Sequence, residues 1–206
     1  MTKTKSRAPD KSDTNARARI IAEARKRFAS SGFDGASTRQ IADDAGVAQS
    51  LLLYHFGSKE VLWKAMMDDT FERARLIGLA NVGMDTSAPP KEQLLASVRA
   101  FIQVCRELPD LHRLMTIEGR TKSERLTWLA KKHLKPAFDA SLKLIVRAQK
   151  DGIVKPGDPA LIHYGIIAIA GMAYAFAPEI SLMTGKKARP DPVEVEKLVS
   201  DFLFTR

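Results

Sequence analysis

The chain has 206 residues, of which 45% are hydrophobic and 28% are charged. These fractions exclude a globally disordered chain, and the length fits one domain or a small module joined to a larger one. The formal net charge of +9 favours acidic partners such as nucleic acid or an anionic membrane surface. A single cysteine, Cys105, excludes an internal disulfide and a cysteine-based zinc cluster, and it fits the reducing cytoplasm.

Membrane insertion is not expected from the hydropathy pattern. The N-terminal residues are polar and lack the apolar stretch of a signal peptide. Residues 160–177 approach the length of a transmembrane helix, but they contain His163 and Tyr164, and Pro178 follows them. We therefore expect a buried helix there, and a cytoplasmic protein without a membrane partner.

The first predicted helix carries apolar residues at helical spacing, from Ile20 to Ala29. Asp13 and Thr14 are both placed to cap its start, and Gly32 is a natural stop at its end. The basic run at 25–27 within this helix is interpreted as an ordinary solvated face.

The rest of the chain also has helical periodicity, which predicts an all-α fold. Two short helices separate at Gly46, and a longer helix opens at Ser58. Residues 81–90 are small, polar and proline-ended, and they form the clearest break in the chain. Pro136 predicts a kink or a local break inside a helix. The helices expected beyond the break span residues 91–107, 109–119, 123–152, 158–184 and 191–205.

The two short helices have the spacing of a helix-turn-helix. Thr38 is placed to cap the first of them, and the small side chain of Ala42 allows the second to cross closely. Gly46 suits the left-handed turn between the helices, and Val47 fills the corner. Leu52 returns to the core ten residues after Ala42. This spacing predicts that the second helix enters the major groove of DNA.

The second short helix has apolar residues on two sides. With Leu52 directed inward, Phe56 lies about 40° from it around the helix, whereas Tyr54 points the opposite way. Leu51 and Leu53 flank the outward side. Outward leucines can contact thymine methyl groups in the groove, and the alternative is that they pack against neighbouring helices.

The polar and basic residues around this helix agree with DNA binding. Gln49 and Ser50 are placed to bond base edges or phosphate. Residues 1–40 contain ten Lys or Arg against four acids, and we assign the basic arm at their start to phosphate or minor-groove contact. Lys59 begins the next helix, where a cation opposes the helix dipole, so an external phosphate is a reasonable cause.

Taken together, these residues resemble the TetR family of transcriptional regulators. The resemblance covers about the first 65 residues and rests on Phe33, Thr38, Ile41, Ala42, Ala45, Gly46, Val47, Leu52, His55, Phe56 and Lys59. It implies a homodimer of about nine helices per chain that binds a palindromic operator, with a C-terminal pocket whose small-molecule effector releases the DNA. The corresponding parts are a basic arm at 1–12, a helix-turn-helix domain at 13–59, and a ligand-binding and dimerisation domain at 60–206.

The resemblance also assigns residues to the DNA interface. Thr38 and Lys59 are expected to hold phosphates, and the segment 49–55 is expected to read the groove. The full predicted set is Thr38, Arg39, Gln49, Ser50, Leu51, Leu53, Tyr54, His55 and Lys59. The chain departs from the family at one position, because the usual tyrosine is Leu53 here and the aromatic ring follows at Tyr54. The ring is thereby rotated by about 100° around the helix, which puts any operator taken from a relative in doubt.

In the C-terminal part, the predicted helix at 158–184 is apolar on all sides of its central turns and must be covered. Pairing with the helix at 191–205 and with the same two helices of a second chain would cover it. The candidate pocket residues lie on helices that line the pocket of relatives, although each is more often plain core: Phe101, Cys105, Met115, Trp128, Phe138 and Tyr174. We interpret His112 and His163 as hydrogen-bonded or surface histidines, and no residues have a metal-binding spacing.

Three functions follow from these features in decreasing order of support. The first is a DNA-binding transcriptional regulator of the repressor type, which a small, largely apolar effector releases. The second is a dimeric interaction protein that uses Leu51 and Leu53 as a protein surface. The third is a helical enzyme, which lacks support because we find no nucleophile–base pair, no glycine-rich phosphate loop, and no cofactor or metal motif.

Overall fold

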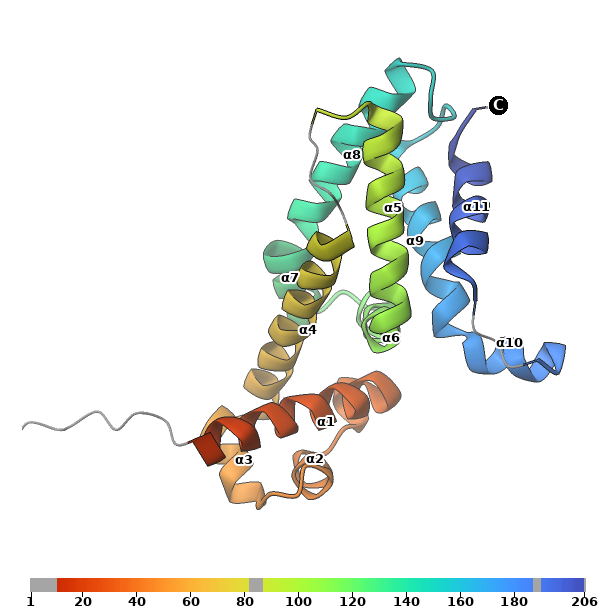
Figure 1. Cartoon of the computed structure of the whole chain (residues 1–206). Coiled ribbons are helices and arrows are strands. Elements are labelled where there is room, and N and C mark those ends of the chain that lie inside the picture. The colour runs from red at the N-terminus through yellow and green to blue at the C-terminus, as the bar shows by residue number, and fades with distance from the viewer. Residues whose placement is uncertain (1–10, 82–86, 187–189, 206) are drawn as a thin grey trace, which may run out of the picture. The chain divides into compact units, whose positions relative to one another are not determined.

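The computed structural model describes residues 11–81, 87–186 and 190–205 (Figure 1). Within these residues the regular elements are helices, apart from one isolated bridge between Val154 and Phe204. The all-α prediction is therefore confirmed. The chain divides into two compact units, which meet between Thr70 and Phe71 inside a long helix. The predicted basic arm falls almost entirely within residues 1–10, which lie outside the described residues.

The first unit is built from three helices and the start of a fourth. Their bounds are α1 (Lys11–Gly35), α2 (Thr38–Asp44), α3 (Gln49–Phe56) and α4 (Lys59–Asn81). Its core contains large side chains that are fully buried: Ile20, Phe28, Ile41, Leu52, Leu62, Trp63, Met66 and Met67. The core therefore takes residues from all four helices.

The ends of these helices follow local signals in the sequence. The first helix begins at Lys11, slightly before the predicted capping residues. Gly32 interrupts this helix with a φ of 69°, a backbone conformation that glycine adopts without steric cost. This agrees with its predicted role as a helix stop. The long helix opens after Ser58, close to its predicted start. The Ser58 hydroxyl accepts a hydrogen bond from the Val61 amide at 3.2 Å and caps this helix.

The second unit is a bundle in which α5, α9 and α11 run side by side (Figure 1). The bounds of its helices are α5 (Pro90–Glu107), α6 (Pro109–Glu118), α7 (Glu124–Leu129), η1 (Ala130–Leu134), α8 (Lys135–Lys150), α9 (Pro159–Ala175), α10 (Ala177–Thr184) and α11 (Pro192–Leu203). Buried residues of α5, α8, α9 and α11 form its main hydrophobic core. Val154 and Phe204 close this core where the bridge joins the end of α11 to the segment after α8.

The helix predicted at 123–152 is interrupted next to Pro136, as the sequence predicted. The turn η1 before Pro136 is a π-helix, and α8 starts with Pro136 in its first turn. Proline cannot donate the backbone hydrogen bond that an uninterrupted helix needs at this position, so a wider turn takes up the mismatch. The predicted break at Pro136 is confirmed.

The single helix predicted at 158–184 is wrong, because the structure divides it into α9 and α10 at Phe176. The two axes are bent by 64°. Pro178 stands in the first turn of α10 and cannot donate to the carbonyl of Tyr174, so the helix changes direction there. Counting α7, η1 and α8 as one interrupted helix and α9 with α10 as another gives nine helical segments in the described ranges.

Among the described residues, no single helix has both the length and the apolar character of a membrane span. The bent pair of α9 and α10 meets that test by length and composition when the two are taken together. Within the bundle, Ile166, Ala170 and Tyr174 of α9 are buried against other helices.

Candidate nucleic-acid interface

The turn between α2 and α3 has the tight geometry that the spacing predicts. Ala42 is fully buried, and its carbonyl accepts a hydrogen bond from the Val47 amide at 3.0 Å. Gly46 has a φ of 64° and completes this left-handed helix end. A side chain at Ala42 larger than a methyl group would separate the two helices, and Leu52 of α3 is fully buried beneath them.

The outward side of α3 presents an aromatic ring. Tyr54 is 78% exposed and Leu53 is 41% exposed, while Leu52 and Phe56 on the other side are buried. Leu51 is only half-buried. The exposure of Leu53 and Tyr54 matches the helical-wheel prediction. The half-buried Leu51 does not decide between its two predicted roles, which are contact with the groove and packing against neighbouring helices.

The N-termini of α2 and α3 lie close together. The Gln49 amide is 3.5 Å from the Thr38 hydroxyl, so the first turns of the two helices are neighbours. The predicted capping role of Thr38 is wrong, because Thr38 is the first residue inside α2 and Ser37 stands at the N-cap. Neither helix has a side-chain cap, because Ser37 makes no capping bond and Ala48 has no polar side chain. Backbone N–H groups at such ends are donors for an anion, and the helix dipoles favour a negative charge there.

Three further residues of the predicted set lie around this edge. Arg39 and Ser50 are exposed on the first turns of α2 and α3. His55 is half-buried, and its ring lies 5.5 Å from that of Tyr54, centroid to centroid, in an edge-on arrangement. His55 therefore supports the position of Tyr54 within the module.

Lys59 has a structural contact that the sequence did not reveal. Its Nζ donates to the backbone carbonyl of Asp34 at 3.2 Å and lies 4.7 Å from the centre of the Phe33 ring. These contacts fasten the end of α1 to the start of α4. An ammonium group has three N–H donors, so the bond to Asp34 leaves donors for a phosphate.

The interpretation of residues 25–27 as a solvated face is wrong for Arg25, whereas Arg27 stays exposed and is paired with an acid. The side chain of Arg25 is only 13% exposed, and its Nη1 lies 3.5 Å from Oδ2 of Asp69. Arg27 Nε donates to Asp44 Oδ2 at 2.6 Å, and this hydrogen bond lowers the pKa of Asp44 and raises that of Arg27. These pairs connect α1 to α4 and to α2, so they fix the frame that holds α3.

The six candidate pocket residues fall into different surroundings in the second unit. Cys105 and Tyr174 are buried in the main core, with Phe101 packed against it. The other three are half-buried: Met115 is on α6, Trp128 contacts the His133 ring, and Phe138 contacts the rings of His163 and Tyr164. A groove of about 510 Å³ in the described structure is lined by none of the six, but by Lys91, Leu95, Lys155, Ser200, Asp201, Phe204 and Thr205.

Of the two histidines considered in the sequence, His163 has the hydrogen bond expected of it, and His112 has a packing role instead. His163 Nδ1 is 2.9 Å from the Ser141 hydroxyl. The ring of His112 packs directly on Gly171 of α9, where a methyl group would overlap it. Burial lowers the pKa of both histidines. Among the described residues, no group of three or more His, Cys, Asp or Glu side chains is arranged to hold a metal ion.

The surface of the bundle carries exposed apolar side chains on two neighbouring helices. Leu161, Tyr164 and Met172 are exposed on α9, and Leu198 and Phe202 on α11. The first three recur at a spacing that places them along one side of α9. The helices approach closely at Gly165, where an added methyl group would lie 2.5 Å from Cζ of Phe202.

A compact helix-turn-helix with an exposed aromatic residue, joined in one chain to a larger helical bundle, defines the class of one-component DNA-binding regulators. The family model described as bacterial regulatory proteins of the tetR family matches residues 20–66. The HTH-type transcriptional regulator RutR of Escherichia coli K12 is 30% identical over 173 residues, which cover 84% of this chain and 80% of that protein. This chain belongs to the TetR family and is a transcriptional regulator.

Two further similarities agree with this family. The HTH-type transcriptional repressor KstR2 of Mycolicibacterium smegmatis is 28% identical over 116 residues, covering 50% of this chain and 56% of that protein. The crystal structure of AibR in complex with isovaleryl coenzyme A and operator DNA has the same fold, with a TM-score of 0.74 and 20% identity. That likeness covers 92% of this chain and 98% of AibR.

Proposed function

We propose that this regulator is a repressor that binds a palindromic operator as a homodimer and is released by a small, largely apolar effector. The observation that carries the proposal is Tyr54, exposed on α3 beside the uncapped N-termini of α2 and α3. A protein gains nothing in stability from an aromatic ring in water, whereas a groove-reading helix needs contacts on that side.

Different residues of the module have different tasks in this proposal. Tyr54, Leu53 and Leu51 contact bases or the sugar edge, and Gln49 and Ser50 bond base edges. His55 supports Tyr54 from within the module. Phosphates are held by Thr38, Arg39 and Lys59, together with the backbone amides at the starts of α2 and α3. The proposed module comprises residues 13–59, preceded by the basic arm at 1–12.

The proposed dimer is formed by the exposed apolar sides of α9 and α11. Leu161, Tyr164 and Met172 on one helix and Leu198 and Phe202 on the other are the side chains that a second copy would cover. A two-fold axis would then bring each of these helices against the same pair of the partner. The ligand-binding and dimerisation part is assigned to residues 60–206.

Release of DNA follows from the geometry that a dimer must have. The two recognition helices must lie about 34–36 Å apart to enter successive major grooves on one face of DNA. An effector weakens binding if its affinity is higher for a dimer with another spacing. The crystal structure of AibR contains both isovaleryl coenzyme A and operator DNA, which supports a small molecule and DNA as partners of one fold.

The decisive experiment is selection of binding sites from a random double-stranded DNA pool, followed by affinity measurements at several salt concentrations. We expect an enriched palindrome and a steep fall of affinity with salt, because several phosphates are contacted. Tyr54→Ala should weaken binding to the selected site by about tenfold, within the range of a base contact. Leu182→Ala is the control, because Leu182 is 80% exposed but lies in the bundle.

The alternative function predicts a different result. A dimeric interaction protein would enrich no sequence, and Tyr54→Ala would leave its weak affinity for DNA unchanged. Leu51 and Leu53 would then be part of a protein-binding surface.

A further inference from the structure

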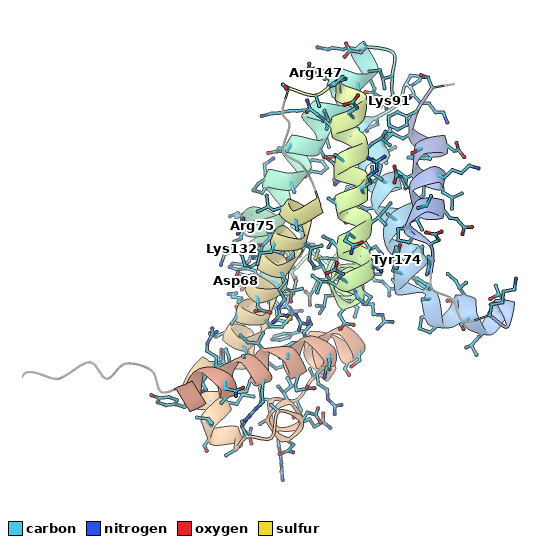
Figure 2. All side chains as sticks on the ribbon, viewed as in Figure 1. Asp68, Arg75, Lys91, Lys132, Arg147 and Tyr174 are labelled. Atoms are coloured by element: carbon cyan, nitrogen blue, oxygen red, sulfur yellow. The ribbon has the colours of Figure 1, made fainter. Side chains whose placement is uncertain are left out.

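The hydroxyl group of Tyr174 is the feature of the bundle that its fold does not explain. The side chain is 7% exposed, and its hydroxyl makes no hydrogen bond. Figure 2 shows Tyr174 on α9, on the side of that helix that faces α5. A buried hydroxyl without a partner has lost its hydrogen bonds to water and gained none in return, so phenylalanine would be the more stable choice for a purely structural ring.

Two other polar side chains belong to the same part of the core. Cys105 of α5 is 3% exposed and lies close enough to Tyr174 to interact with it electrostatically. His112 of α6 packs on Gly171, which is one helical turn before Tyr174 on the buried side of α9. Three helices therefore bring a hydroxyl, a thiol and an imidazole towards one region of an otherwise apolar core.

The charge state of this cluster restricts what it can bind. Burial raises the pKa of Tyr174 and raises that of Cys105 to about 12, and it lowers the pKa of His112. All three groups are consequently uncharged at neutral pH. The charged residues whose fields reach Tyr174, Arg106 and Asp191, are opposite in sign, and both are exposed. A carboxylate in this region would be buried without a paired cation, which is costly.

An uncharged acceptor avoids that cost. A carbonyl oxygen accepts one hydrogen bond from a phenol, and the apolar remainder of the ligand replaces contacts with the surrounding core. His112 is half-buried at the edge of the cluster, so we expect its ring to move away from Gly171 when the ligand enters.

We propose that the Tyr174 hydroxyl donates a hydrogen bond to the carbonyl oxygen of an uncharged effector with an apolar body, bound where Cys105, His112 and Tyr174 meet. This assignment rests on the effector-controlled regulator proposed above, and it names the chemical class of the effector. Tyr174 is the specificity-determining residue for that class, because a site with an unpaired donor discriminates against ligands that cannot satisfy it.

The test uses the full chain, matched sets of small molecules on the same carbon skeletons, and calorimetric and thermal-shift binding assays. One set is cyclohexanone, cyclohexane and cyclohexanecarboxylate, and the second is 2-octanone, octane and octanoate. We expect the ketones to bind the wild type, and Tyr174→Phe to reduce their affinity by about tenfold, as for one hydrogen bond. Ser97→Ala is the control, because it removes a hydroxyl from the exposed side of α5, where that hydroxyl bonds only the Gln93 carbonyl of its own helix.

The ligand-free stability of Tyr174→Phe gives a second, independent readout. The variant should unfold at the same temperature as the wild type or higher, because it removes an unpaired hydroxyl without changing the shape of the ring. Clear destabilisation would mean that the hydroxyl has a partner in the free protein and would overturn the proposal. Equal ketone affinity in both proteins, tighter binding of the carboxylates, or no binding of any ketone to the wild type would overturn it as well.

The proposal and the proposed function can fail separately. Binding of the selected operator by ligand-free wild type tests the regulator, and Tyr174→Phe should bind that operator with unchanged affinity. If the ketones bind through Tyr174 but no operator is selected, the ligand site stands and the DNA-binding function fails. If an operator is selected but the ketones bind equally to both proteins, the regulator stands and the ligand class fails.

Discussion

Replacement of Gly171 by alanine tests the close approach of α6 and α9 on which the proposed site depends. A methyl group at this buried position would overlap Nδ1 and Cε1 of His112 and would lie 3.0 Å from its Cγ. Rotation of the ring about its own bond cannot remove a contact with Cγ, so the whole side chain must leave its position. Overpacking of this kind costs about 1–3 kcal/mol.

An opposing contribution comes from the helix itself. Alanine is favoured over glycine inside a helix by about 0.5–1 kcal/mol. The packing cost less this gain is centred on about 1 kcal/mol, so we expect Gly171→Ala to lower the free energy of unfolding by about 1 kcal/mol and Tm by about 2–4 °C in a chain of this size. The assay is chemical and thermal unfolding followed by circular dichroism, at one fixed protein concentration because a dimer makes Tm concentration-dependent.

Gly78 supplies the control for the intrinsic preference of alanine. It lies inside α4, and a methyl group there would enter open space. Gly78→Ala should stabilise the protein by about 0.5–1 kcal/mol. A double variant with His112→Ala should recover most of the loss caused by Gly171→Ala. If Gly171→Ala is as stable as the wild type, the packing of His112 on α9 is not as tight as described, and the reasoning is refuted.

Three further predictions concern single interactions. Leu52→Ala should destabilise the first unit by about 2–5 kcal/mol in chemical denaturation, because the side chain is fully buried. Ser123→Ala should cost about 1 kcal/mol in the same assay, because its hydroxyl accepts from the Leu126 amide at 3.0 Å and caps α7. The hydrogen bond from Arg27 holds the pKa of Asp44 below its ordinary value of 3.8, so its contribution to stability is present above that pH and is lost as the pH falls through the lower folded-state value. The stability difference between the wild type and Asp44→Asn, measured by denaturation at pH 7 and at successively lower pH, should therefore shrink in acid; a constant difference would contradict the charge-based origin.

The helix-turn-helix could be predicted from the sequence because its determinants are local. The small residue at Ala42, the left-handed turn at Gly46 and the buried Leu52 fall within eleven successive positions, and helix geometry alone fixes their relation. The same geometry predicted that Tyr54 points away from Leu52, and their exposed fractions of 78% and 0% agree. The pairs of Arg25 with Asp69 and Arg27 with Asp44 could not be predicted, because they join residues far apart in the sequence.

At two prolines the sequence could not predict whether the helix would kink or end. Pro136 and Pro178 both stand in apolar helical patterns, and both begin a new helix in the structure. A proline in such a pattern is compatible with a mild kink or with a fresh helix start, since it removes one hydrogen bond in either case. The packing of each following segment decides between these outcomes, and α10 changes direction by 64° while α8 continues from the π-turn.

The proposed effector site could not be predicted from local sequence patterns. Cys105, His112 and Tyr174 belong to three helices, and no spacing in the sequence indicates that they meet. The family resemblance placed Cys105 and Tyr174 among six candidate pocket residues, but the sequence could not show that the Tyr174 hydroxyl has no partner. That fact comes from the packing of the whole bundle, since a hydroxyl finds its partners among residues distant in the chain.

The DNA-binding half and the effector-binding half of such a regulator are therefore assigned from different kinds of observation. DNA presents the same groove to every helix-turn-helix, so the residues that fit it recur at fixed spacing and the pattern alone carries the function. Effectors differ in shape from one regulator to another, so no fixed spacing of residues marks their site. The polar atoms that the core leaves unpaired specify that site instead. In this chain the unpaired polar atom is the hydroxyl oxygen of Tyr174. The apolar residues around it would contact any effector with an apolar body equally well, so the hydroxyl says more about the chemistry of the ligand than they do.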